Sequence, residues 1–264
     1  MPSVRQGIVT PSLVLAMMVH LVALGSFEAS AQEPETGTSG RTRPAAKSQT
    51  KSKRSAPRDR PGFYKGRRIA DVMSYLGADW LIRETREQEE QPEAMLDALK
   101  IPKGATVADV GAGVGYTSLR MARRVGPTGT VYATDVQPEM IRMLQANARG
   151  AGVEGIVKPI LCTATDTKLP EGRVDLALMV DVYHECSDPE AVLQGIRKAL
   201  KPGGRLVLVE FRAEDPDVPI KPEHKMTLKQ ARLEVEPQGF TFKESLEFLP
   251  WQHIIIFEKP RDNP

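Results

Sequence analysis

A glycine-rich turn directly after a short apolar run is the feature that most constrains this fold. Residues 107–110 are apolar except for Asp109, the turn carries Gly111, Gly113 and Gly115, and a helical pattern opens directly after it. A strand that passes into a helix through such a turn presents backbone amides to a ligand, and glycine allows positive φ and close approach. The stretch predicts a nucleoside-binding loop at the end of a sheet strand.

The spacing of the glycines indicates which nucleoside fits. A dinucleotide fingerprint needs a third small residue where the helix packs beneath the pyrophosphate, but here the third glycine comes one position early and Tyr116 occupies that place. This argues against a pyrophosphate on the helix. An NAD(P)-dependent oxidoreductase remains open as an alternative, since it would share the strand, the loop and a following acid.

A second strand pattern, residues 130–135, ends in Asp135. The distance along the chain from the glycine turn to Asp135 fits one strand–helix–strand unit. It therefore places the Asp135 carboxylate at the tip of the neighbouring parallel strand, where it can accept both hydroxyls of a ribose. An acid before a helix is also a common helix cap, and Asp135 precedes a helical run that opens at Pro138. We interpret Asp135 as a ribose-binding residue.

The segments that follow complete an α/β domain. Strand patterns occur at 156–161, 174–181 and 205–211, and a helix from Pro189 ends in the turn of residues 201–204, Lys-Pro-Gly-Gly. A helix with the stripe Leu228, Ala231 and Val235 and two more strands follow, of which the last spans 253–258.

Together, residues from about 93 to 259 resemble class I S-adenosylmethionine (AdoMet) methyltransferases. Within that class they are most similar to the small-molecule methyltransferases related to quinone-biosynthesis enzymes. The resemblance rests on the glycine loop, the acid at Asp135 and the Pro-Gly-Gly turn in this order. It implies a Rossmann-like doubly wound sheet, mostly parallel, with the last strand inserted antiparallel between its two predecessors. It also implies AdoMet as cofactor and a small, partly hydrophobic methyl acceptor.

The resemblance assigns cofactor contacts to residues at the carboxyl ends of the strands. Thr163 and Ala164 follow the third strand, where the family often has an acid that meets the adenine amine; Asp166 is a possible substitute for that acid. The predicted cofactor-binding residues are Asp109, Gly111, Gly113, Gly115, Asp135, Thr163, Ala164 and Asp181.

The loop after the fourth strand supplies the catalytic candidates. Asp181, Tyr183, His184 and Glu185 lie there, and ligands of open α/β sheets bind beyond the carboxyl ends of strands. We predict Asp181 and His184 as catalytic residues, with His184 as a general base, against the alternative of a packed or hydrogen-bonding histidine. Tyr183 is a predicted contact of the acceptor.

Residues 61–92 are predicted to be a helical extension that lies over the cofactor, ahead of a methyltransferase domain at 93–264. Ile69, Val72, Met73 and Leu76 recur at helical spacing. Tyr64, Trp80 and Arg86 are lid candidates, although core packing of Trp80 and surface pairing of Arg86 are more common roles. His253, near the start of the last strand, is a second candidate for the acceptor pocket.

Metal binding is not expected, because Cys162 and Cys186 are isolated and the four histidines show no paired ligand spacing. Both cysteines are predicted to be free thiols. The charge is nearly balanced, with 36 Lys and Arg against 34 Asp and Glu, so nothing global suggests a nucleic-acid partner.

The first 60 residues are not expected to contribute to the hydrophobic core of the folded domain. Residues 1–31 resemble an export signal, with Arg5, an apolar run at 13–24 and a cleavage pattern at 29–31, which predicts a periplasmic or secreted protein; an uncleaved membrane anchor is the alternative. Residues 32–60 are a basic, disordered linker, in which a weak contact with an anionic surface is the minor interpretation. Because AdoMet is made inside cells, an exported domain would use leaked or delivered cofactor, whereas an anchor with the basic linker would hold the domain on the cytoplasmic side. A non-catalytic protein that keeps the cofactor site and has lost transfer is a separate alternative.

Overall fold

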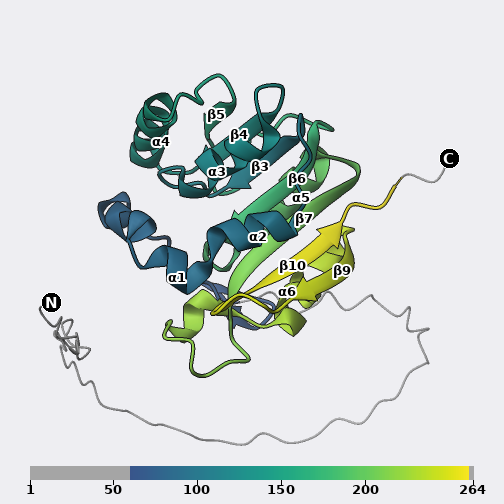
Figure 1. Ribbon diagram of the computed structural model, residues 1–264. Helices are drawn as coiled ribbons and strands as arrows, with labels where there is room; N and C mark the ends of the chain where they lie inside the picture. The colour runs from purple at the N-terminus through teal and green to yellow at the C-terminus, as the bar shows by residue number, and fades with distance from the viewer. Residues whose placement is uncertain (1–59, 262–264) are drawn as a thin grey trace, which may run out of the picture. The chain divides into compact units, whose positions relative to one another are not determined.

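The computed structural model describes residues 60–261, so the predicted signal and almost all of the predicted linker lie outside the described residues. A twisted sheet forms the centre of this part of the chain, with helices on both faces (Figure 1). The strand order is β5-β4-β3-β6-β7-β10-β9, and the short β8 pairs with β7. Between residues 60 and 261 no helix is both long and apolar enough to span a bilayer.

The strands follow the apolar runs of the sequence. Five strands, β5, β4, β3, β6 and β7, run parallel to one another, and β10 runs antiparallel to both β7 and β9. The last strand therefore inserts between its two predecessors, and the predicted fold class is confirmed. The sheet strands are β3 (Thr106–Val110), β4 (Thr130–Asp135), β5 (Val157–Leu161), β6 (Val174–Val180), β7 (Leu200–Arg212), β8 (Lys225–Met226), β9 (Thr241–Leu246) and β10 (Gln252–Glu258).

Two apolar cores lie on the two faces of the sheet. Leu96, Met121 and Leu144 belong to the core under α2, α3 and α4, whereas Ile196 and Val235 belong to the core under α5 and α6. The helices span α1 (Arg86–Glu90), α2 (Pro92–Ala98), α3 (Tyr116–Val125), α4 (Pro138–Gly150), α5 (Pro189–Ala199) and α6 (Leu228–Val235). Proline stands in the first turn of α2, α4 and α5, where it removes no helical hydrogen bond.

The segment before α2 differs from its prediction. Instead of a helix over Ile69 to Leu76, the chain forms a small hairpin of β1 (Phe63–Tyr64) and β2 (Arg67–Arg68), continues without regular structure, and enters a 3₁₀ helix at Tyr75–Ile82. Ser74 caps that helix through its hydroxyl, and Val72 and Leu76 are exposed. The apolar spacing predicts a buried helical face, but Val72 and Met73 line a cavity instead of a core and Leu76 faces solvent.

Candidate functional site

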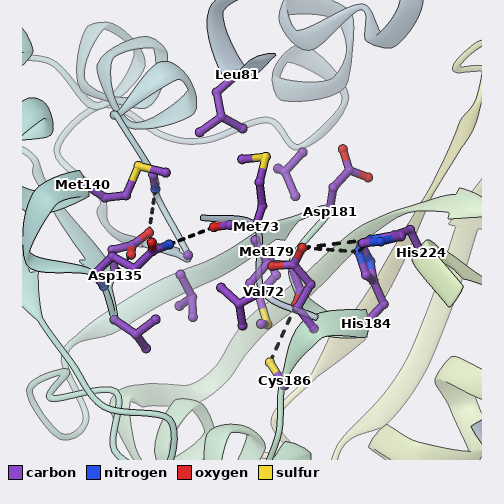
Figure 2. A pocket seen from close by; sticks show the side chains of 18 of the residues that line it. Val72, Met73, Leu81, Asp135, Met140, Met179, Asp181, His184, Cys186 and His224 are labelled. Carbon is purple, nitrogen blue, oxygen red and sulfur yellow. Dashed lines mark hydrogen bonds and ion pairs between the residues drawn. The ribbon is translucent and has the colours of Figure 1, made fainter. Parts of the chain in front are cut away.

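A cavity of about 530 Å³ opens at the carboxyl ends of β3, β4 and β6 and is covered by the segment from Val72 to Arg86. Figure 2 shows Asp135 and Met140 toward one end and His184 and His224 toward the other, with Met73, Val72 and Met179 between them. The wall thus changes in character along its length, from carboxylate and glycine backbone to methionine and valine and then to imidazole.

The glycine loop forms the cofactor-side wall through backbone geometry that side chains would obstruct. Gly111 and Gly113 have φ of 75° and 54°. A Cβ on Gly111 would lie 2.4 Å from Cγ1 of Val182, and one on Gly113 would lie 2.7 Å from Cδ1 of Leu81. The amide of Gly111 donates to the carbonyl of Thr134 at 2.9 Å, which ties the loop to β4. Gly111 therefore needs glycine for both conformation and space, whereas Gly113 needs it for its conformation and could be enlarged only if Leu81 shifts.

Asp135 lies at the tip of β4 with its carboxylate at the cavity wall. Oδ2 accepts the amide of Gly113 and Oδ1 accepts the amide of Gln137, each at 2.9 Å. Burial raises the pKa of this carboxyl, whereas the two amides lower it. Gln137 is itself the N-cap of α4, so Asp135 does not cap the helix in the usual way. Its oxygens retain lone pairs for the hydroxyls of a ribose.

A buried group of charges lies beside the loop. Nε of Arg86 donates to Oε2 of Glu90 at 2.7 Å, and Nη1 donates to the carbonyl of Leu81, also at 2.7 Å. Asp181, with φ of 54°, accepts a 2.8 Å hydrogen bond on Oδ2 from Nε2 of Gln252, a residue of β10. Its Oδ1 is buried and finds no partner among residues 60–261. A buried acceptor without a donor fits a ligand that supplies an N–H.

The site therefore fits AdoMet on the observations of this chain. The glycine cradle, the Asp135 carboxylate and the unpartnered Oδ1 of Asp181 surround one cavity. Burial raises the pKa of Asp181 well above its ordinary value, and the nearby charges of Glu90 and Glu210 add to that rise. An ammonium group placed at Oδ1 would offset this cost.

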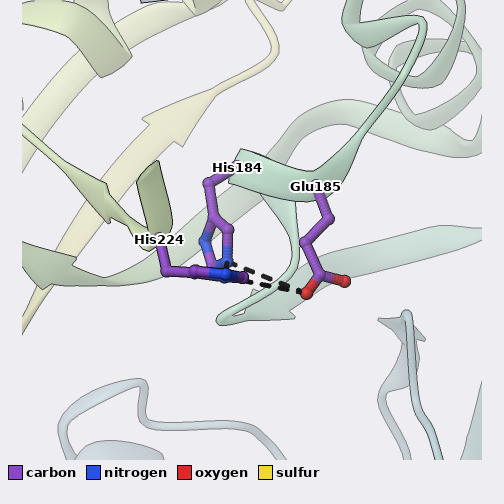
Figure 3. A group of neighbouring side chains, drawn as sticks. All are labelled: His184, Glu185 and His224. Carbon is purple, nitrogen blue, oxygen red and sulfur yellow. Dashed lines mark hydrogen bonds and ion pairs between the residues drawn. The ribbon is translucent and has the colours of Figure 1, made fainter. Parts of the chain in front are cut away.

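At the other end of the cavity, two histidines and a glutamate turn toward one another (Figure 3). Nε2 of His184 lies 3.1 Å from Nδ1 of His224, and Oε1 of Glu185 lies 4.0 Å from each of these nitrogens. Burial raises the pKa of Glu185 to about 7 and lowers the pKa of His224.

A second carboxylate fixes the orientation of His184. Nδ1 of His184 lies 2.5 Å from Oε2 of Glu210, and the other oxygen of Glu210 accepts the amide of Tyr183 at 2.9 Å. Because a carboxylate accepts, Nδ1 carries the proton and Nε2 presents a lone pair to the cavity. The backbone carbonyl of His184 accepts from Nη1 of Arg67 at 2.9 Å, so the ring and the main chain are both held.

The structure brings most of the predicted site residues together. They line the cavity from the 3₁₀ helix, the glycine loop and the ends of β4, β5 and β6: Trp80, Arg86, Gly111, Gly113, Asp135, Thr163, Ala164, Asp181 and His184. Trp80 is half exposed at the opening, so it is not a core residue, and Arg86 is buried, so it is not a surface partner. Asp166 pairs with Lys168 away from the wall and does not replace the acid expected near Thr163.

Two predicted cofactor residues, Asp109 and Gly115, lie behind the cavity wall instead of in it. Asp109 is buried behind the loop, where its Oδ2 accepts the hydroxyl of Ser118 at 2.6 Å. Burial raises its pKa to about 6. Gly115 is the N-cap of α3, and a Cβ there would meet Leu144 in the core. Both residues shape the loop, and neither lines the cavity.

Three predicted acceptor contacts are also structural. The hydroxyl of Tyr64 donates to Oε1 of Glu190 at 3.1 Å. Tyr183 is fully buried in the core under α5, and His253 is buried within β10. None of the three lines the cavity, because their strand or turn positions direct them into the protein.

Sequence reasoning missed Glu210 and His224. His224 stands in a short turn at Pro222–His224, and its contact with His184 joins residues 40 positions apart. The prediction that no metal is bound rests on the spacing of ligands along the chain. It therefore does not detect a cluster whose members come from distant segments. An acid in the apolar run of β7, Glu210, was the one available signal, because a buried acid needs a partner.

Known proteins are similar to this chain in sequence and in fold. Residues 108–208 match a family model described as a methyltransferase domain. The ubiquinone/menaquinone biosynthesis C-methyltransferase UbiE of Enterobacter sp. (strain 638) is 31% identical over 116 residues, which are 44% of this chain and 46% of that protein. The match thus spans about half the length of the curated relative.

Solved structures extend the similarity. A SAM dependent methyltransferase from Aquifex aeolicus is 25% identical, with a TM-score of 0.67, over 71% of this chain and all of that chain. The geranyl diphosphate C-methyltransferase of Streptomyces coelicolor A3(2), solved with Mg²⁺, geranyl-S-thiolodiphosphate and S-adenosyl-L-homocysteine, shares the fold at 15% identity, with a TM-score of 0.54, over 64% of this chain and 75% of that chain. Residues 108–208 thus resemble a methyltransferase domain, and the α/β fold around them is shared with a solved SAM dependent methyltransferase; S-adenosyl-L-methionine is the methyl donor of that family.

Proposed function

We propose that the protein transfers a methyl group from AdoMet to a small, partly apolar acceptor. The observation that carries the proposal is a single cavity with a glycine cradle and Asp135 toward one end and an apolar wall leading to His184 at the other. One cavity with two chemically different ends can hold donor and acceptor in contact, which is the main requirement for an in-line displacement.

The cofactor end supports a specific placement of residues. Asp135 would accept the ribose hydroxyls, and Thr163 and Ala164 would border the adenine. Oδ1 of Asp181 would accept the ammonium of the methionine moiety, and the guanidinium of Arg86, at the wall beside it, would face the carboxylate. Each contact pairs a charge or lone pair of this chain with its complement.

When bound, AdoMet supplies an electrophilic methyl group on a sulfonium. The remaining work of the protein is positioning and exclusion of water. Met73 and Leu81 of the covering segment and Met179 of β6 line the middle of the cavity. Apolar side chains there exclude water from the path between the two ends.

The acceptor end defines a class of substrate. Phe211, Pro219 and Ile220 give it apolar walls, while His184 and Lys221 are polar. This combination supports a compact acceptor with one apolar face and one polar group. We retain the prediction that Asp181 and His184 serve the reaction, with Asp181 at the cofactor and His184 at the acceptor.

Calorimetric titration with AdoMet, NAD and NADP tests the proposal. Micromolar or tighter AdoMet binding is expected, with no binding of NAD or NADP. Binding of NAD in place of AdoMet would favour an oxidoreductase. Binding of AdoMet without turnover over a panel of phenols, quinols and amines would favour a binding protein that lacks transfer activity.

We further propose the organisation predicted for the whole chain: a cleaved signal at 1–31, a basic linker at 32–60, a covering extension at 61–92 and the methyltransferase domain at 93–264, in an exported protein. The support is the order of a charged start, an apolar run and a small-residue cleavage pattern. N-terminal sequencing of the mature protein should find a chain that begins at Gln32. A chain that retains residues 13–24 would instead support the membrane anchor.

A further inference from the structure

We propose that His184, Glu185 and His224 bind one divalent transition-metal ion at the acceptor end of the cavity. Each residue contributes one ligand atom, and the three atoms turn toward a common point (Figure 3). The site itself does not depend on the methyltransferase activity, because it is built from the geometry of these side chains.

The distances match what one ion can span. Metal bonds to imidazole nitrogen and carboxylate oxygen are about 2.1 Å long, so two ligand atoms on one ion are at most about 4.2 Å apart. The separations here are 3.1 Å between Nε2 of His184 and Nδ1 of His224, and 4.0 Å from each to Oε1 of Glu185. A point equidistant from the three atoms lies about 2.2 Å from each, within the range of such bonds.

A hydrogen-bonded cluster alone explains the arrangement less well. A single proton can join the two ring nitrogens at 3.1 Å, but the Glu185 oxygen at 4.0 Å is beyond hydrogen-bond distance of both. All three lone-pair atoms therefore face space that one cation would fill. All three residues also line the cavity, so positions of the ion not used by the protein would open into it.

The surroundings of His184 are those of a metal ligand. Its Nδ1 donates to the fully buried carboxylate of Glu210, which fixes the tautomer and directs the Nε2 lone pair to the cluster. Histidine ligands commonly donate their other ring nitrogen to a carboxylate in this way, which makes the ligating nitrogen more basic. The backbone carbonyl of His184 is anchored separately by Arg67.

The ligand set indicates the class of metal. Two neutral imidazoles and one carboxylate suit Zn²⁺ and neighbouring transition metals, whereas Mg²⁺ and Ca²⁺ prefer oxygen ligands. Three protein ligands leave at least one coordination position for another group. In the context of the proposed function, on which this step rests, that position would take a hydroxyl or carboxylate oxygen of the acceptor. His184 would then hold the ion instead of acting as a general base.

The test measures metal binding without AdoMet. The full chain is prepared without a polyhistidine tag, freed of metal with a chelator, and titrated with Zn²⁺ by calorimetry; bound Zn²⁺ is counted after gel filtration. We expect one equivalent for the wild type. H224A and E185Q should bind about 100-fold more weakly or not at all, because each loses a ligand. E223Q is the matched control, since Glu223 is a partly exposed acid beside His224 that lies outside the cluster, and it should bind as the wild type does.

Several outcomes decide the matter. Absence of a stoichiometric ion in the wild type, or wild-type affinity in folded H224A and E185Q, would overturn the proposal. Thermal unfolding monitors the fold of each variant, and if one variant does not fold the other decides. Substitution with Co²⁺ gives an independent readout, because nitrogen ligation produces visible absorption bands that should be lost in H224A. Zn²⁺ binding in a protein that fails to bind AdoMet would leave this inference standing and refute only the proposed function.

Discussion

Gly113 and Leu81 are so close that a side chain on Gly113 would displace the end of the Leu81 side chain: a Cβ on Gly113 would lie 2.7 Å from Cδ1 of Leu81. Gly113 belongs to the loop after β3, and Leu81 belongs to the covering 3₁₀ helix. The contact couples the cofactor loop to the segment that closes the cavity. A change in the loop therefore acts on the cover, and the two effects can be separated experimentally.

We expect G113A to weaken AdoMet binding about tenfold or more, because the added methyl group meets Leu81 and the backbone has φ of 54°. L81A removes the clash but leaves the strain. In a double-mutant cycle followed by calorimetry, the loss in the double variant should be smaller than the sum of the single losses by about 1 kcal/mol. Strict additivity would show that Leu81 and Gly113 do not interact.

Asp135 should control cofactor affinity. In D135N, one of the two carboxylate oxygens becomes an amide nitrogen, so one acceptor and the negative charge are lost beside the ribose. We expect AdoMet binding to weaken by about 10- to 100-fold, which is the usual cost of a hydrogen bond to a charged group. D166N is the control, because Asp166 is exposed and pairs with Lys168. Equal effects of both changes on the calorimetric affinity would refute the ribose role.

The buried pair of Arg67 and Glu234 should be a main determinant of stability. Nε and Nη2 of Arg67 donate to the two oxygens of Glu234, each at 2.9 Å. E234Q leaves the buried guanidinium without its charge partner. We therefore expect the free energy of unfolding, measured by urea titration, to fall by about 3 kcal/mol. The matched change at the C-cap of the same helix, E236Q, breaks an exposed pair with Arg232 and should cost less than about 1 kcal/mol. A small effect of E234Q would mean that water reaches Arg67.

Asp109 should make stability depend on pH. Burial raises its pKa to about 6 in the folded protein, above the ordinary 3.8. The protonated form is the favoured one, so its contribution is fully present below about pH 4 and is lost as pH rises through 6. Relative to D109N, the wild type should lose about 3 kcal/mol of unfolding free energy between pH 4 and pH 7.

The comparison with D109N isolates this carboxyl from the other buried acids. D217N, at an exposed position, should follow the wild-type pH profile. Parallel profiles of the wild type and D109N would show that Asp109 has an ordinary pKa. Denaturant titrations at each pH supply the measurement.

Local sequence patterns predicted the sheet well, and they predicted that the glycine loop and Asp135 lie at one edge of it. The glycine loop, Asp135 and the order of the apolar runs specify neighbouring strand tips, because parallel strands present their carboxyl ends at one edge. The covering segment was harder to predict. Val72, Met73 and Leu76 have helical spacing, but Val72 and Met73 line a cavity and Leu76 is exposed, and periodicity does not distinguish these positions from a core.

The acceptor end could not be predicted from patterns along the chain. His184 and His224 meet only because a turn before β8 returns toward the end of β6. Charged residues were also misleading. Arg86 stands in a run of mixed charge typical of an exposed helix, yet it is buried against Glu90 and stacks over the ring of Tyr116. Burial of an ion pair depends on packing partners that the local sequence does not specify.

The position of β10 in the sheet sets a limit on when the site can form during synthesis. Gln252, its first residue, holds Asp181 at the cavity, and the strand pairs on both sides with segments made before it. A nascent chain must therefore reach β10 before Asp181 gains its hydrogen bond from Gln252. A nascent chain stopped after β9 would expose the edge of β7 and lack the support of Asp181. The residues that line the cavity are all made before β10, so this strand completes the support of the site and not its lining.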